Sequence, residues 1–127
     1  MLEWSAITIR VPESQQDAVT ALSGSGPAYF FLLAELMTDA AVALGLPHAS
    51  ARELAIQTLF GSGRMARDSD GDLARLRAEV TSKGGTTEAA VRTFDAANLR
   101  GIVAAALEAA TNRGREMAKT FGGKPGT

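Results

Sequence analysis

The feature that most limits how this chain can fold is an apolar stretch over residues 28–44. If this stretch is a helix, apolar side chains cover nearly all of its faces, and a helix of that kind needs burial on most of them. The apolar members are Tyr29, Phe30, Phe31, Leu32, Leu33, Leu36, Met37, Ala40, Ala41, Val42 and Leu44. In a domain of 127 residues, one chain has little else to cover such a helix. We therefore expect a second copy of the chain to supply the cover, in a homodimer.

The same stretch is not expected to cross a membrane. Glu35 and Asp39 interrupt it, whereas a spanning helix needs roughly 20 mostly uncharged residues. The net charge of -1 gives no electrostatic reason to expect nucleic acid or an anionic membrane as a partner. Residues 1–4 lack the basic region and apolar run of a secretory signal, so we expect a cytoplasmic protein. With no cysteine and one histidine, His48, no metal site is expected.

The remaining sequence alternates between helical patterns and short turns rich in glycine, proline and aspartate. Helices are expected over residues 14–22, 27–44, 48–68, 73–80, from 87 to a break at 98–101, and 102–120. Ser14 is the expected N-cap of the first helix, and Gly45 the C-terminal cap of the second. Residues 5–11 alternate apolar and polar side chains, which predicts a short strand that pairs outside this domain or lies loose. The expected fold class is all-α, a bundle of about five to six helices.

Three segments resemble ligand-binding loops only superficially. Residues 24–26 lack the third glycine of the dinucleotide fingerprint and the surrounding βαβ unit, and residues 61–63 lie inside a helical pattern. Lys83 precedes its glycines, so it does not belong to a Walker loop. The aspartates of residues 68–72 alternate as in a calcium loop, but the later ligand positions are missing. We expect that cluster to be a turn followed by a helix cap.

The segment most suited to binding a ligand is Val-Thr-Ser-Lys-Gly-Gly-Thr-Thr-Glu, residues 80–88. Two adjacent glycines widen the choice of backbone conformation and leave no side chain in the way of a ligand. The segment then enters a helix, whose first N–H groups are unpaired and carry partial positive charge. A small carboxylate can dock on the N–H groups of Gly85, Thr86 and Thr87, with hydroxyls from Ser82 and both threonines nearby.

A plain interhelical turn explains the same residues. In that interpretation Gly85 or Thr86 is only an N-cap, and Glu88 is only an acid that suits the positive end of the helix dipole. Most turns of this composition bind nothing, so the residues alone favour the plain turn and leave the carboxylate site open.

Two stretches of the sequence resemble the dimerisation domain of pyrroline-5-carboxylate reductases. Residues 17–31 are similar to the opening of that domain, and residues 76–91, with Val-Thr-Ser-Lys-Gly-Gly-Thr-Thr inside them, are similar to the family's signature. The two motifs stand in the family's order and spacing, and the resemblance covers about residues 12–119. It implies a lead-in over residues 1–12 and a dimerisation domain over 13–121. The composition of residues 122–127 predicts a flexible tail.

This family reduces 1-pyrroline-5-carboxylate to L-proline with NADPH or NADH, the last step of proline synthesis. The resemblance implies helical domains that interlock in pairs, with further assembly of the dimers, and a Rossmann domain ahead of each. It also implies a substrate site at the signature loop. The Ser82 hydroxyl and the backbone groups of Gly84, Gly85 and Thr86 would hold the substrate carboxylate. Thr87 would lie near the ring nitrogen and the nicotinamide as the catalytic and cofactor-contacting residue, and Val80 would line the ring pocket.

Three departures from the family bear on these expectations. Some relatives have proline where Lys83 stands, and many have proline where Leu73 stands. The residues before Pro12 are too few for a Rossmann domain, so we expect no cofactor bound to this chain alone and no reductase activity from it. The alternative function is a non-catalytic helical oligomerisation module whose loop is empty.

Overall fold

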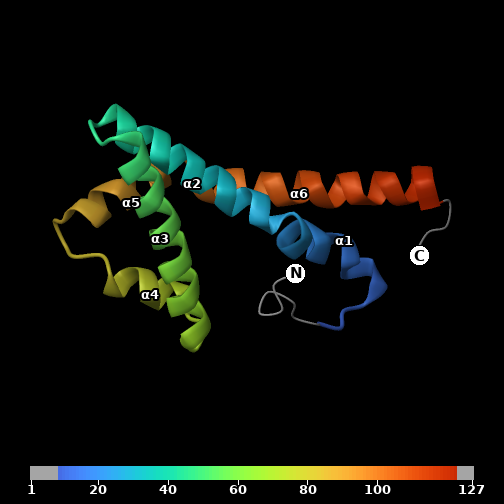
Figure 1. Cartoon of the computed structure of the whole chain (residues 1–127). Helices are drawn as coiled ribbons and strands as arrows, with labels where there is room; N and C mark the ends of the chain where they lie inside the picture. Colours follow the sequence, from blue (N-terminus) through green and yellow to red (C-terminus); the bar gives the residue numbers. More distant parts are fainter. Residues whose placement is uncertain (1–8, 123–127) are drawn as a thin grey trace. The chain divides into compact units, whose positions relative to one another are not determined.

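The computed structural model describes residues 9–122, and within that range the chain has helices and no strands (Figure 1). Its helices are the 3-10 helix η2 (Glu13–Gln15), α1 (Gln16–Val19), the π-helical turn η3 (Thr20–Gly24), α2 (Gly26–Ala43), α3 (His48–Asp68), α4 (Leu73–Glu79), α5 (Thr86–Ala96), α6 (Leu99–Met117) and the π-helical turn η4 (Ala118–Gly122). The expected all-α class is confirmed. The chain divides into two compact units, one of residues 27–102 and one of the residues on either side of them.

A glycine ends α2 as the sequence predicts. Gly45 has a φ of 108°, and its N–H donates to the Val42 carbonyl at 3.0 Å. The Leu46 N–H donates to the Ala41 carbonyl at 3.1 Å, which completes a Schellman cap. Pro47 then precedes α3 in an extended conformation. The pair of stop signals therefore makes a tight turn between the two longest helices of this unit.

Replacing Gly45 by alanine isolates the backbone cost of this cap. A Cβ there meets no atom within 4 Å, so the expected loss of about 1–2 kcal/mol comes from the positive φ alone. A Cβ on Gly63, inside α3, also meets no atom within 4 Å. Gly63→Ala should instead stabilise the fold by about 1 kcal/mol, because alanine has the higher helix propensity. Urea unfolding at one fixed protein concentration measures both. Equal effects of the two substitutions would contradict this account.

The beginning of the helical region differs from the expectation. Ser14 does not cap a helix: it lies inside η2, which follows Pro12, and no side chain caps that 3-10 helix. Proline fixes its own φ and favours a turn directly after it, so the helical backbone starts one residue before the predicted cap. The predicted strand over residues 5–11 lies mostly outside the described residues, and residues 9–11 belong to neither helix nor strand.

The start of α6 also differs from the expectation. The break falls at Asn98, which has a φ of 60°, and the helix begins at Leu99, three residues before the predicted start at residue 102. The Asn98 side chain accepts the Gly101 N–H at 3.3 Å. A Cβ on Gly101 would collide with that side chain. Gly101 therefore makes room for the Asn98 cap and does not break the helix.

The core of the single chain is small. The buried apolar side chains among the described residues are Ala21, Ala51 and Ala55, and the only buried polar one is Thr38, whose hydroxyl donates to the Ala34 carbonyl at 2.8 Å. Large apolar side chains stay exposed along α2, among them Phe31 at 66% and Leu36 at 54%. Within the described range no large side chain is fully buried. The chain on its own thus leaves its most apolar helix largely in water.

Each unit brings helices together through small residues. In the unit of residues 27–102, a shallow hollow of about 150 Å³ follows α2 and α3 beside their connecting turn. It is lined by Met37, Ala41, Leu46, Ala51, Leu54, Ala55 and Thr58. In the other unit, Gly114 of α6 lets Asp17 of α1 approach so closely that an added Cβ would lie 2.9 Å from its carboxylate. None of the described helices has the length and apolar character to cross a membrane.

Candidate functional site

The segment that leads into the candidate site is an acidic turn, as the sequence predicts. Asp72 is the N-cap of α4, and its carboxylate accepts the Arg75 N–H at 3.1 Å. Asp70 accepts a bond from the Arg75 guanidinium at 2.8 Å. Leu73 is the first residue of α4, a position that proline also suits. The leucine that stands here in place of a proline is therefore compatible with the same turn.

A tight turn at residues 82–85 joins α4 to α5. The Gly85 N–H donates to the Ser82 carbonyl at 3.0 Å, and Gly84, the third residue, has a φ of 74°. A positive φ at that position is the mark of a type II turn, which requires glycine there. Lys83 occupies the second position, where proline is favoured in such turns. Lysine or proline at residue 83 can therefore form the same turn.

The first turn of α5 presents unpaired donors to the solvent. Gly85 is the N-cap residue and offers no side chain to the N–H groups that follow. In an α-helix these first N–H groups have no intrahelical acceptor and carry partial positive charge. The N–H groups of Thr86 and Thr87 can therefore donate hydrogen bonds to an anion, with the hydroxyls of both residues beside them.

Glu88 closes the loop in a way that the sequence analysis missed. The Gly84 N–H donates to Glu88 Oε1 at 3.1 Å, and the same oxygen lies 3.3 Å from Arg92 Nη2. The Glu88 side chain is 28% exposed, while that of Arg92 is 78% exposed. The spacing of four residues between Glu88 and Arg92 is the available sequence signal, since such pairs face each other on a helix.

The predicted site residues Ser82, Gly84, Gly85, Thr86 and Thr87 follow one another through the turn and into the first turn of α5. Val80 stands apart at the end of α4 and is 58% exposed. The resemblance assigns backbone groups of Gly84, Gly85 and Thr86 to the substrate, but the first two N–H groups are engaged within the loop. Gly84 donates to Glu88 and Gly85 donates to Ser82. The Thr86 N–H is left for a ligand, together with that of Thr87, which the helix start adds.

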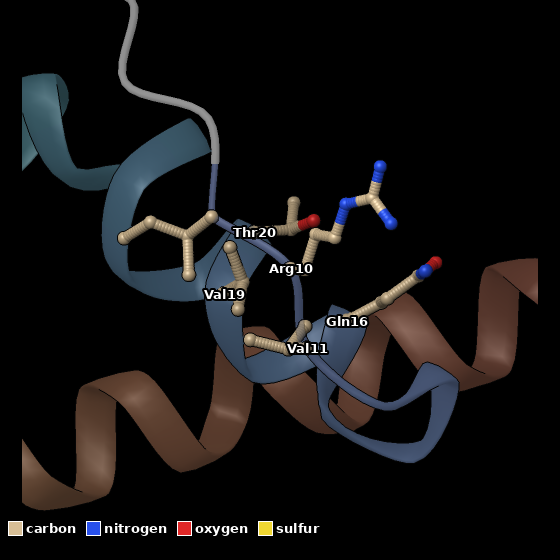
Figure 2. A pocket seen from close by; sticks show the side chains of 6 residues that line it. Arg10, Val11, Gln16, Val19 and Thr20 are labelled. Atoms are coloured by element: carbon tan, nitrogen blue, oxygen red, sulfur yellow. The ribbon is translucent and has the colours of Figure 1, made fainter.

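A second hollow, of about 480 Å³, lies near the start of the described chain (Figure 2). Ile9, Arg10, Val11, Gln16, Val19 and Thr20 line it. Figure 2 shows Arg10 and Gln16 extending outward on the same side, with Val11 and Val19 on the opposite side. Its lining has no carboxylate, imidazole or thiol. Among residues 9–122, no three acidic, histidine or cysteine side chains are grouped to hold a metal ion. The loop at residues 82–88 is therefore the better candidate.

Comparisons with known proteins identify the family to which the chain belongs. Residues 13–117 match the family model described as pyrroline-5-carboxylate reductase dimerisation. The chain is 51% identical over 110 residues to the pyrroline-5-carboxylate reductase of Pseudomonas aeruginosa, covering 87% of this chain and 40% of that one. It is 48% identical over 126 residues to the Mycobacterium leprae reductase, covering 86% and 43%.

Solved structures give the same result. The Plasmodium falciparum pyrroline carboxylate reductase with NADP bound aligns with a TM-score of 0.82 at 33% identity, over 88% of this chain and 43% of that one. The Coxiella burnetii reductase aligns with a TM-score of 0.80 at 43% identity, over 86% and 40%. The chain thus spans about two fifths of the length of these relatives. It belongs to the pyrroline-5-carboxylate reductase family, and residues 13–117 are the dimerisation domain of that family.

Proposed function

We propose that this chain is the dimerisation and substrate-carboxylate-binding domain of an NAD(P)H-dependent pyrroline-5-carboxylate reductase, which forms L-proline from 1-pyrroline-5-carboxylate. The observation that carries the binding half is the type II turn at residues 82–85, which opens directly onto the uncapped start of α5. Such a helix start attracts a carboxylate through its free N–H groups and its dipole. The names of the relatives supply the substrate.

Self-association is the other half of the proposal. It is supported by α2, which is apolar on nearly all sides and has Phe31 and Leu36 more than half exposed in the single chain. Exposed apolar surface of this extent marks a protein–protein interface. A second copy that packs its own α2 against this one removes both surfaces from water at once. An interlocked pair of helical domains satisfies this requirement.

The redox half of the reaction needs NADPH or NADH, which supplies the hydride when bound. The described residues fit only the reacting edge of such a cofactor, because Thr87 offers one partly exposed hydroxyl and no phosphate-binding loop accompanies it. In the proposed reaction the N–H groups of Thr86 and Thr87 hold the substrate carboxylate and so orient the ring. The Thr87 hydroxyl donates a hydrogen bond to the ring nitrogen, and Val80 contacts the ring.

L-proline binding tests the ligand half of the proposal. L-proline should raise the melting temperature of the chain in a thermal-shift titration, since a ligand bound only by the folded state stabilises it. Gly85→Ala should weaken binding about tenfold, the scale of one lost charged hydrogen bond. Its new Cβ would lie 3.2 Å from the Ser82 carbonyl and 3.4 Å from the Ser82 Cβ, so the turn has to shift.

The matched control is Lys83→Pro, which changes the neighbouring residue and preserves a type II turn. It should bind L-proline within about twofold of the unmodified chain. If the unmodified chain shows no shift at high L-proline, and Gly85→Ala behaves in the same way, the loop is empty. The chain is then a non-catalytic oligomerisation module.

A further inference from the structure

The Glu88 carboxylate is unusual because it lies in a loop to which the proposed function assigns a second carboxylate. Its Oε1 accepts the Gly84 N–H at 3.1 Å, across the tight turn. Gly84 is the residue whose φ of 74° defines that turn. The bond therefore ties the turn to the first helical residues of α5, and it fills the Gly84 donor with an acceptor from the protein itself.

Arg92 offsets the electrostatic repulsion between the Glu88 carboxylate and a ligand carboxylate bound at the same loop. Two carboxylates within a few ångströms repel each other, and the repulsion grows where water is partly excluded. Arg92 Nη2 lies 3.3 Å from the same Glu88 oxygen, one helical turn further along α5. The pair as a whole is neutral, so a ligand carboxylate that approaches the N–H groups of Thr86 and Thr87 meets no net negative charge from Glu88.

We propose that Glu88 is a positioning residue for the substrate carboxylate and that Arg92 is its counter-ion. Glu88 holds the Gly84 N–H and so keeps the turn in the shape that exposes the Thr86 and Thr87 donors. Gly84 and Gly85 then shape the loop, while Thr86 and Thr87 bind the ligand. The proposal rests on the proposed function, since it concerns the same ligand at the same loop.

Three variants of the full chain test this role, with L-proline as the probe in calorimetric titrations. Glu88→Gln keeps an oxygen acceptor for Gly84 and should bind L-proline at least as well as the unmodified chain. Glu88→Ala removes the acceptor and should bind about five- to tenfold more weakly. Arg92→Gln leaves Glu88 unneutralised and should bind about two- to fivefold more weakly at low salt. That last loss should vanish in 0.5 M salt, as simple damage to the fold would not.

Hydrogen exchange at the Gly84 amide supplies a readout that needs no ligand. The amide should be protected in the unmodified chain and in Glu88→Gln, and should lose protection in Glu88→Ala while the helix content stays constant.

Equal or tighter L-proline binding by Glu88→Ala would overturn the role, because Glu88 would then compete with the ligand for Gly84. If Glu88→Ala fails to fold, the other two variants decide. Arg92→Gln binding like the unmodified chain at low salt also overturns the role, whereas a salt-dependent loss supports it. An unmodified chain that binds no L-proline overturns the proposed function together with this role. Binding that is indifferent to Glu88 and Arg92 overturns the role alone.

Discussion

A single charged substitution in the middle of α2, Leu36→Glu, is expected to convert a dimer of this chain into a monomer. Leu36 is 54% exposed in the single chain, although it lies on the most apolar helix. Burying a leucine contributes about 1.5–3 kcal/mol, and a symmetric dimer buries two. Forcing two carboxylates into the same interface adds a further cost. A total of at least about 4 kcal/mol raises the dimer dissociation constant roughly a thousandfold.

Sedimentation velocity across a range of chain concentrations measures this change directly. Arg67→Gln is the matched control, because it alters the charge by one unit near the polar end of α3 and leaves α2 untouched. It should sediment as the unmodified chain does. The Leu36→Glu monomer should also unfold at lower urea, since no large side chain of the described single chain is fully buried. An unmodified chain that remains a compact monomer at high concentration would contradict the dimer.

The sequence predicts the helices well where strong local signals bound them. Pro47 and the acidic turn after Asp68 delimit α3, and the structure gives the same bounds. Gly45 ends α2 because its positive φ is open to glycine and strained for other residues. At the start of α6 the sequence misled, since Gly101 suggests a break. There the structure depends on one asparagine in a left-handed conformation, and composition does not reveal that conformation.

The candidate site, too, could be predicted from the sequence only in part. The glycine pair and the threonines after it predict a turn that enters a helix, and the structure contains that turn. Which N–H groups stay free depends on the φ of Gly84 and on the rotamer of Glu88, and neither can be inferred from residue types. The Gly85 donor, expected to face a ligand, is used by Ser82 inside the turn. Dimer formation depends on a second copy of the chain. The sequence therefore predicts that α2 has to be covered by a partner, but it does not predict how the two copies pack.

The chain alone is expected to oxidise no NADPH or NADH in the presence of 1-pyrroline-5-carboxylate. Hydride transfer requires the nicotinamide to be held against the imine carbon, and such positioning supplies much of the rate. Neither Gly-Ser-Gly segment in residues 9–122 resembles a dinucleotide-binding loop, because no described strand precedes either one and the second lies inside α3. The family resemblance implies a Rossmann domain ahead of this one. Joining this chain to the part of the Pseudomonas aeruginosa reductase that it does not match should therefore create turnover that neither part has alone.

Substitutions of Thr87 in the joined protein test whether this domain supplies part of the active site. Thr87→Val removes the hydroxyl proposed to contact the ring nitrogen and keeps the side-chain volume, so kcat should fall about a hundredfold, the lower range for a group that assists proton transfer. Thr87→Ser keeps the hydroxyl and should retain most of the rate. Both variants should still bind L-proline, because the Thr86 and Thr87 N–H groups remain.

Steady-state measurement of NADPH oxidation separates kcat from KM. Turnover by the unjoined chain would contradict the prediction that this chain alone is inactive. Full activity in Thr87→Val would show that the Thr87 hydroxyl has no part in the catalytic step.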